Sequence, residues 1–447
     1  MPDPSDQILS SLDAALKRSA ADATELVYVG TRDATTRFAE NGIHQNMLSS
    51  DGRVIVRLMK DGRVAVSSTN DLSVSGLDRA IADALEIASF LAPDAAFPGF
   101  VKSDTAPVVN AFDPAMDSCP PERRAQAVSH IVDQAKPAGV QASGLFRLTT
   151  SRVAIANSAG TRQYHQDTVA ELSVSASDDP TFGQGWSTGV SHKIDQLDPK
   201  ELGRIAIDKA VRSRNPQTLP AGEYTVILEP AAVGQLLLFL GFLAFSGKSF
   251  AEGRGIFSGK IGELVTGANI TVHDDPFLAE FTGMPFDYEG VPKRKMALIE
   301  NGVARGVAHD SRSAKLAGVE STGHALPADN PRGAYPKNLV MAPGDATLDD
   351  MIASTSMGLL ITHFWYINYL NPMKAQVSGS TRDGTFLIEN GAITKPVRNL
   401  RATPTILEAF AKADQIGKDR VVYPQYSAAM YVPAMKIAGM TFVEDTE

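Results

Sequence analysis

The feature that most constrains the fold is a strongly apolar stretch at residues 223–245, just past the middle of the chain. It reads EYTVILEPAAVGQLLLFLGFLAF and begins with the alternation of a β-strand. Pro230 ends that alternation and suits the first turn of a helix, where its missing N–H would have no partner. The helix that follows is apolar almost all the way round, as helices buried in large proteins are. We therefore predict a strand that leads into a buried helix, and residues 235–245 of this helix include no charge and no histidine.

The length of the chain predicts two domains, since 447 residues exceed what one hydrophobic core usually serves. The clearest linker signal is NPQTLPAG at residues 215–222, which is rich in residues that form loops. We place an N-terminal domain at residues 1–217 and a C-terminal domain at residues 218–447.

Composition argues against several classes of partner and indicates a location. The net charge of −9 argues against a protein that binds nucleic acid through phosphate contacts. The longest apolar run, residues 235–245, is far shorter than the ~20 residues of a membrane-spanning helix. The only cysteine, Cys119, cannot form an internal disulfide, which fits a reducing compartment. Because the first residues read as an amphipathic helix and not as a signal peptide, we expect a cytoplasmic protein.

The N-terminal domain is predicted to be an α+β domain with an internal pseudo-repeat. A helix, a strand and a hairpin occur twice in the same order, and the turn sequences AENG and ANSAG stand at equivalent places. The first copy has a helix at 6–21, a strand at 25–29 and hairpin turns at Asn41-Gly42 and Asp61-Gly62; the second has a helix at 121–135, strands at 142–149 and 153–156, and a turn at 157–160. A helix over 198–212, capped by Asp198, closes the domain.

The C-terminal domain is predicted to be mostly β, with a mixed, barrel-like sheet and a few buried helices. Two related hairpins, ALIENGVARGV at 297–307 and FLIENGAITKPV at 386–397, place Asn-Gly between apolar strands, a preferred pair for a tight turn. The residues TLDD at 347–350 start a short helix in the manner of a capping box. The overall fold class is therefore α+β, with two domains of different architecture.

A series of motifs along most of the chain resembles those of the TldD/PmbA family, whose members are described as metallopeptidases or as subunits of them. The motifs are TRFAENGIHQN near the start, FSGKIGE at 257–263, DDP at 274–276, PFDYEGVPKRKMALIENG at 285–302, HDSRSAKLAGVESTGHA at 309–325, NLVMAPGDATLDDMI at 338–352 and SGSTRDGTFLIENG at 378–391. Their number and their order carry the resemblance.

The resemblance implies which kind of family member this chain is. TldD-type members carry His-Glu-x-x-x-His on the helix after the first strand of the second domain, with a cysteine near the C-terminus as a third zinc ligand. In this chain the two histidine positions fall on Leu238 and Leu243, and the glutamate position falls on Phe239. A shift of one or two residues changes nothing, because residues 231–251 contain no His, Glu or Cys. The chain therefore resembles the PmbA (TldE) type, which holds no metal and pairs with a TldD-type subunit that carries the zinc.

Other candidate residues read more simply as structural. His273, His309, His324 and His363 stand in sequences typical of turns and caps, so only their convergence in space would indicate a metal site. The Gly-rich segment 253–262 lacks the spacing of a phosphate-binding loop. Ser378 and Ser380 lack the motif of a serine hydrolase.

Three charged residues are weak candidates for chemistry in an enclosed chamber. Asp287 and Glu289 are separated by one residue, so a strand would place both carboxylates on one face, as general acid–base work requires. A solvated loop ahead of Gly290 explains them more simply. Arg382, in the sequence RDG, could bind a peptide carboxylate. A type I or I′ turn would explain the same sequence by a structural role alone.

The sequence thus leads to one functional hypothesis and two alternatives. The hypothesis is a support subunit of a TldD/TldE-type zinc peptidase that acts on small or unfolded peptides, in peptide maturation or degradation. The substrate would be held in extended form by strand addition. The first alternative is an independent enzyme on the same fold that uses residues such as Asp287, Glu289 and Arg382. The second is a homodimeric module that binds peptides or small molecules without turnover.

Overall fold

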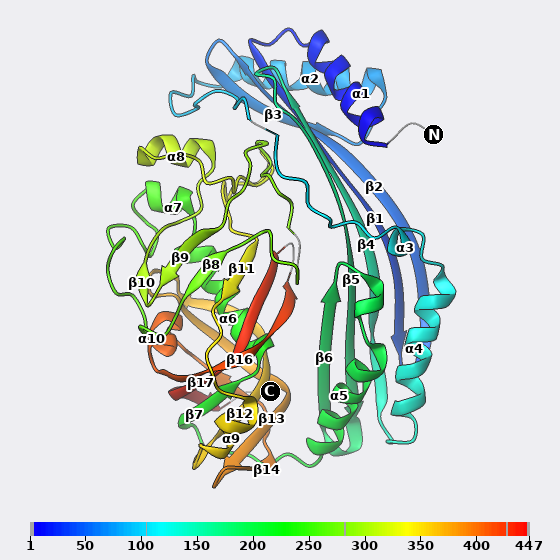
Figure 1. Cartoon of the computed structure of the whole chain (residues 1–447), viewed down its shortest axis with the longest axis vertical. Helices are drawn as coiled ribbons and strands as arrows, with labels where there is room; N and C mark the ends of the chain where they lie inside the picture. Colours follow the sequence, from blue (N-terminus) through cyan, green and yellow to red (C-terminus); the bar gives the residue numbers. More distant parts are fainter. Residues whose placement is uncertain (1–3, 104, 281–282, 426–427, 445–447) are drawn as a thin grey trace.

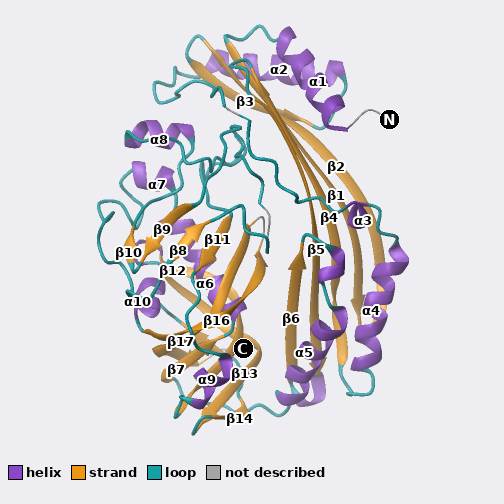
Figure 2. Cartoon of the chain, in the orientation of Figure 1, coloured by secondary structure: helices purple, strands orange, loops and turns teal. Residues whose placement is uncertain are grey.

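The chain forms two β-sheet structures that lie side by side, as the computed structural model in Figure 1 shows. The structure describes residues 4–103, 105–280, 283–425 and 428–444. Figure 2 shows that the N-terminal part is one long curved sheet with helices on it, whereas strands and loops of the C-terminal part lie around α6 (Pro230–Ala244). An α+β fold is therefore confirmed.

The N-terminal sheet has six antiparallel strands in the order β3-β2-β1-β4-β5-β6. The strands are β1 (Ala23–Ala39), β2 (Gly42–Lys60), β3 (Arg63–Thr69), β4 (Gln141–Asn157), β5 (Arg162–Asp178) and β6 (Gly183–Ser191). β1 and β4 pair along the middle of the sheet, from Glu25 opposite Asn157 to Phe38 opposite Gly144. The two halves of the sheet are therefore joined by their first strands.

Each half of this sheet is built from a helix, three strands and a second helix, which confirms the predicted repeat. The helices are α1 (Pro4–Arg18) and α2 (Val74–Phe90) in the first half, and α4 (Pro121–Ala135) and α5 (Pro199–Arg212) in the second; α3 (Pro114–Asp117) is a single turn between the halves. The Asp198 side chain caps α5 by accepting from the N–H groups of Lys200 and Glu201, as expected. The AENG and ANSAG turns join β1 to β2 and β4 to β5.

Two details of the N-terminal prediction are wrong. The strands expected at 142–149 and 153–156 are one continuous strand, β4, because the polar residues between them stay extended and paired with β1. The first hairpin turns at Glu40-Asn41, which have φ of 51° and 59°, one residue earlier than expected. The turn at Asp61-Gly62 has positive φ at both residues, as a type I′ turn requires.

The two faces of the N-terminal sheet have different partners. On one face, residues such as Leu26, Phe38 and Leu148 pack beneath the four long helices. On the other face, Val27, Ile55, Val153 and Ile155 form a cluster with Phe286 of the C-terminal part. The strand period of two explains the division, since neighbouring residues point to opposite faces. The C-terminal part therefore packs against the helix-free face.

Five strands of the C-terminal sheet close into a ring, which agrees with the barrel-like architecture expected. The ring consists of β7 (Gly222–Leu228), β12 (Met357–Asn371), β13 (Gln376–Glu389), β15 (Leu400–Ala402) and β17 (Ala428–Glu444). β7 pairs with β12 in parallel and with β17 antiparallel, and these two pairings close the circle. The sheet continues from β17 through β11 (Asn338–Met341), β8 (Val272–Asp274), β9 (Met296–Glu300) and β10 (Val303–Ala304), while β14 (Ala392–Pro396) and β16 (Ala413–Gln425) pair with β13 and β17.

Short helices and tight turns complete the C-terminal part. The helices are α7 (Gly247–Ala251), α8 (Ser311–Ala317), α9 (Leu348–Ala353) and α10 (Ile406–Ala411). Thr347 and Asp350 form the predicted capping box of α9. The predicted hairpin turns at Asn301-Gly302 and Asn390-Gly391 both have the positive φ values that this turn needs. No helix in the described part of the chain has the length and apolar character needed to cross a membrane.

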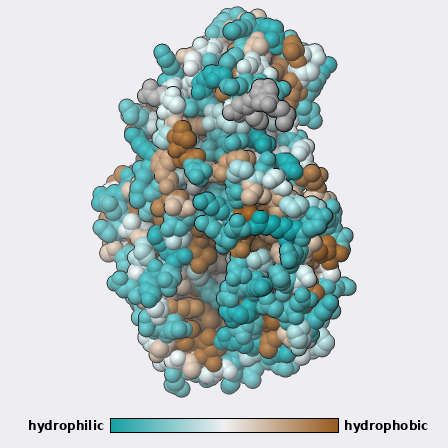
Figure 3. Space-filling view, turned by 45° about the vertical axis from the view of Figure 1, so that its right-hand side comes forward, coloured by the Kyte–Doolittle hydropathy of each residue, from teal (hydrophilic) through white to brown (hydrophobic). Residues whose placement is uncertain are grey.

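The space-filling view in Figure 3 shows one face that is mostly hydrophilic, with separate apolar patches. Several exposed apolar side chains come from one end of β12 and the turn after it: Trp365, Tyr366, Leu370 and Met373. Tyr366 is the most exposed of them at 73%, and its φ of 52° marks a local break in the strand. An exposed group of large apolar side chains is typical of a contact surface.

Candidate functional site

Helix α6, on which the sequence resemblance places the zinc-motif positions, is built into the hydrophobic core. Leu238 is fully buried among residues of β7, β12 and β17. Phe239 and Leu243 are partly buried and pack against the same core. The ring of Phe239 lies 5.1 Å from that of Tyr369, whose hydroxyl donates to the Phe239 carbonyl oxygen at 3.1 Å. All three positions are therefore occupied by apolar packing groups that can neither bind zinc nor accept a proton.

Gln235 is the one polar side chain in the apolar run of α6, and it has a structural role. Its Nε2 donates to the Phe364 carbonyl oxygen at 2.9 Å, and its Oε1 accepts from the Phe364 N–H at 2.7 Å. Phe364 lies in β12 between two breaks in the pairing with β13. Gln235 thus satisfies both the N–H and the carbonyl group of buried Phe364, and these hydrogen bonds hold α6 against the ring of strands.

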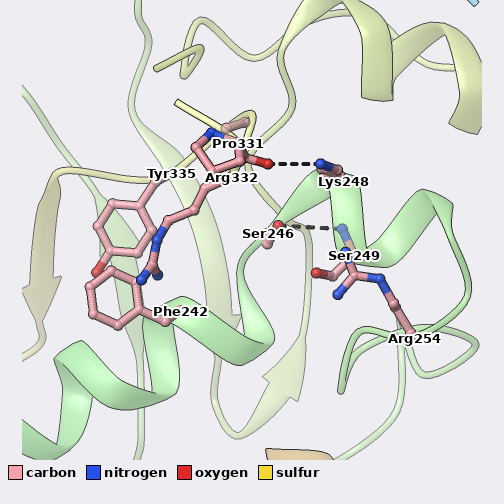
Figure 4. Close-up of a pocket in the computed structure, with 9 residues that line it drawn as sticks. Phe242, Ser246, Lys248, Ser249, Arg254, Pro331, Arg332 and Tyr335 are labelled. Atoms are coloured by element: carbon pink, nitrogen blue, oxygen red, sulfur yellow. Dashed lines mark hydrogen bonds between the residues drawn. The ribbon is translucent and has the colours of Figure 1, made fainter. Parts of the chain in front are cut away.

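A small pocket opens beside the C-terminal end of α6 (Figure 4). Its volume is about 220 Å³. The described residues that line it are Phe242, Ser246, Lys248, Ser249, Arg254, Pro331, Arg332, Ala334 and Tyr335. The rings of Phe242 and Tyr335 lie 4.9 Å apart, and the Arg332 guanidinium lies 4.2 Å from the Phe242 ring centroid. The pocket therefore combines an aromatic wall with a basic rim.

Asp287 and Glu289 lie in a buried turn, so the expectation of a solvated loop is wrong. Phe286 and Pro292 pair across the turn, and the two carboxylates do not share the face of a strand. Asp287 is fully buried and accepts hydrogen bonds from the backbone N–H groups of Glu289 and Val291 at 2.9 Å and of Ala325 at 2.8 Å. Burial, with the nearby Glu289 charge, raises the pKa of Asp287 to about 8.

Glu289 joins the two halves of the molecule through Arg57 of β2. Arg57 Nη1 donates to Glu289 Oε1 at 2.9 Å, and Arg57 Nη2 lies 2.7 Å from Oε1 of Glu25. The other oxygen of Glu289 accepts from the backbone N–H of Ser311 at 2.9 Å. Burial works against ionisation of Glu289, but Arg57 and Ser311 hold its pKa below the ordinary value. The contacts of Asp287 and Glu289 are those of a structural joint, and their catalytic role stays a prediction.

Arg382 lies within β13 and not in the turn that the sequence RDG indicates. The pairing with β12 shifts there, and Asp383 and Gly384 have positive φ, which are the marks of a β-bulge. The Arg382 guanidinium lies 4.6 Å from the ring centroid of Trp365. Next to it, His363 Nε2 lies 2.7 Å from Asp383 Oδ2. The His363 ring lies 4.6 Å from the ring of Trp186 in β6, tilted by 39°, so this bulge is a second contact between the two halves.

The other three histidines do not converge with one another into a metal site. Nε2 of His324 lies 3.0 Å from Asp274 Oδ2, and both side chains are fully buried. His309 Nδ1 lies 3.2 Å from the Ser313 hydroxyl, and Asp310 caps α8, as the turn-and-cap interpretation expects. His273 instead lies in β8, so it is not a turn residue. Within the described ranges, no group of three or more His, Cys, Asp and Glu side chains could hold a metal ion.

Several residues of these sites gave no signal in the sequence. Arg57, Glu25 and Glu289 are far apart along the chain, and no periodic pattern connects them. The same holds for the pocket residues Lys248 and Arg332. Only Gln235, a lone amide in an apolar helix, could have indicated a buried hydrogen-bonding role from sequence.

The fold and the site define an α+β protein of two sheet structures, with an apolar helix α6 at the core of the second. Family models for PmbA/TldA metallopeptidase domain 1, the central domain and the C-terminal domain match residues 24–88, 109–214 and 221–444. The chain belongs to the PmbA/TldD family. These models divide the N-terminal part into two segments; the division at residues 217 and 218 stays a prediction.

Individual relatives agree with this assignment. A solved structure of TldE from Thermococcus kodakarensis superposes with a TM-score of 0.89 over 97% of this chain and 100% of that chain, at 22% identity, and so shows the same fold. A metalloprotease from Methanothermobacter thermautotrophicus is 26% identical over 52% of this chain and 51% of its own length. The chain thus spans about half the length of the first such relatives. The metalloprotease PmbA of Escherichia coli O157:H7 is 23% identical over 91% of this chain and 89% of its length.

Proposed function

We propose that this chain is a non-catalytic support subunit of a TldD/TldE-type zinc metallopeptidase that acts on small or unfolded peptides. It would work with a TldD-type partner that carries the metal, as a heterodimer located in the cytoplasm. The observation that carries the proposal is the packing of α6, where Leu238, Phe239 and Leu243 occupy the motif positions. Zinc peptidases need imidazole or carboxylate ligands and a base to take a proton from water. These three residues offer neither.

The exposed end of β12 supports a partner subunit. Trp365, Tyr366, Leu370 and Met373 are each at least half exposed. The first three belong to β12, which packs on α6 through Tyr369, and Met373 lies in the turn that follows. Aromatic side chains at the centre of an interface contribute most of the binding free energy. A partner seated on this end of β12 would lie near the motif helix, so the two subunits together could enclose a peptide.

The proposal is tested by peptide cleavage with purified proteins. A TldD-type relative that has His-Glu-x-x-x-His is assayed on an unfolded peptide, alone and with this chain added in equal amount. We expect cleavage by the mixture to exceed that by the relative alone at least tenfold, and this chain alone to be inactive. Activity of this chain alone that resists chelators would instead favour an independent enzyme. A self-associated chain that binds the peptide without turnover would favour a homodimeric binding module.

Replacing Tyr366 by asparagine is expected to weaken binding to the TldD-type relative at least tenfold. Loss of an aromatic hot spot costs roughly 2–4 kcal/mol, and asparagine tolerates the positive φ of this position. Met357→Asn is the matched control, because Met357 is an exposed apolar residue at the opposite end of the same strand. Isothermal titration calorimetry gives both affinities. Equal affinities for the two variants would mean that this end of β12 does not contact the partner.

A further inference from the structure

The pocket beside α6 is lined by basic side chains, and the proposed function as a support subunit does not explain them. Lys248, Arg254 and Arg332 all line it, and its described lining includes no aspartate or glutamate. Figure 4 shows Lys248 at the top beside Pro331, the Arg332 guanidinium at the left beside Phe242 and Tyr335, and Arg254 at the right, with Ser246 and Ser249 between the two arginines. A concave site that gathers charge of one sign favours a ligand of the opposite sign.

Arg332 is the cation best placed to bind such a ligand. Its guanidinium is held over the ring of Phe242 at 4.2 Å, and no carboxylate in the described part of the chain pairs with it. The aromatic contact restricts the side chain, so less entropy is lost when its N–H groups bind an anion. Arginine is also the side chain whose paired N–H groups match the two oxygens of a carboxylate or phosphate.

The other two cations remain available around Arg332. Lys248 Nζ donates one hydrogen bond to the Pro331 carbonyl oxygen at 2.7 Å, which fixes the ammonium at the rim without neutralising it. Arg254 pairs with Glu252, but the two side chains are 59% and 40% exposed, and such a pair contributes little. The hydroxyl of Ser246 accepts from the Ser249 N–H at 3.3 Å and keeps its own proton to donate.

We propose that this pocket binds an oxyanion, a carboxylate or a phosphate, whose attached apolar group contacts the accessible part of Phe242. Arg332 would contact the anion directly, with Lys248 and Arg254 adding charge from the rim. The volume of about 220 Å³ suits a single small group and not a folded segment. Phe242, which lines the pocket, precedes Leu243 directly and follows Leu238 by about one turn of α6, so the pocket adjoins the motif positions. That location would matter for catalysis only if the proposed support function is right; the binding itself does not depend on it.

The test measures anion binding by the purified full chain in calorimetry. The probes are inorganic phosphate, N-acetylphenylalanine, and N-acetylphenylalanine amide as the uncharged counterpart. We expect at least one anion to bind, with an affinity that falls as salt is raised, and the amide to bind at least tenfold more weakly than the acid. Binding of phosphate alone would assign the anion as a phosphate; binding of the acid would assign a carboxylate.

Arg332→Gln is expected to weaken anion binding at least tenfold, because it removes the charge and keeps much of the side-chain volume. Arg305→Gln is the matched control, since Arg305 is half exposed, pairs with Glu300 at 3.0 Å and does not line the pocket. The thermal midpoints of both variants show whether the fold is kept. The proposal is overturned if neither anion binds, or if both variants bind as the wild type does. Either result would leave the subunit proposal standing, because that proposal is judged by metal content and peptide cleavage.

Discussion

Replacing Arg57 by methionine is expected to lower the free energy of unfolding by about 3–5 kcal/mol, the usual cost of breaking a buried ion pair from one side. Methionine keeps much of the side-chain volume, so the change is mainly one of charge. The loss should appear as a lower midpoint in guanidinium chloride at neutral pH.

The large expected loss of stability follows from the two buried carboxylates that pair with Arg57. Glu25 and Glu289 are almost completely buried, and both direct an oxygen at the guanidinium. The rings of Phe97 and Phe100 lie within 5.7 Å and 5.2 Å of it and exclude water from one side. Without Arg57, the two buried carboxylates lose the guanidinium that pairs with them, and the ion pair between the N- and C-terminal halves is broken.

The pH dependence of the variant gives a further check. Burial already raises the pKa of Glu25, whereas Arg57 helps to hold the pKa of Glu289 below its ordinary value. Removal of Arg57 should therefore raise the pKa of both carboxyls. A carboxyl whose folded pKa lies above its unfolded pKa binds more protons in the folded state, so stability rises as the pH falls. The difference between variant and wild type should therefore shrink from pH 7 to pH 5.

Arg18→Met is the control for this experiment. Arg18 pairs with Asp78 at 2.8 Å, but both side chains are about 40% exposed, and exposed pairs contribute roughly 0–1 kcal/mol. If Arg57→Met costs no more than Arg18→Met, the joint between the halves does not depend on these charges.

Replacing Leu238 by alanine is expected to destabilise the chain by about 2–5 kcal/mol, because it opens a cavity in a closely packed core. Leu238 has no exposed surface and contacts the largest hydrophobic cluster of the molecule. The result would show that this motif position carries stability and not chemistry.

Leu243→Ala is the matched control on the same helix. Leu243 is only partly buried, so its truncation removes less buried apolar surface. The decrease in the free energy of unfolding should be less than half that of Leu238→Ala. Guanidinium unfolding measures both variants. A Leu238→Ala variant as stable as the wild type would mean that α6 is loosely packed. The apolar residues at the motif positions would then not be part of a close-packed core.

Much of the fold could be predicted because local patterns dominate it. The apolar run of α6, the cap at Asp198 and the turn at Asp61-Gly62 each act over a few residues, and each is present as expected. Strand ends were harder to place. The break expected between 149 and 153 does not exist, since pairing with β1 keeps polar residues extended that would favour a turn in isolation.

The candidate site could be predicted only where the resemblance supplied positions. The motif positions on α6 come from the resemblance alone, whereas the ion pair of Glu289 is made with Arg57, which lies 232 residues away in the sequence. The pocket likewise joins α6 to a loop at 331–335. Contacts of this kind arise from tertiary packing, and no spacing within one segment encodes them.

The most direct test of the support-subunit account is the zinc content of the purified chain. The chain is expressed alone, dialysed against micromolar zinc and then against metal-free buffer, and measured by atomic emission beside a TldD-type relative treated in the same way. The account predicts about one zinc per chain in the relative and well below a tenth of that in this chain, since zinc sites require three or more donor side chains. One tightly held zinc per chain here would contradict it.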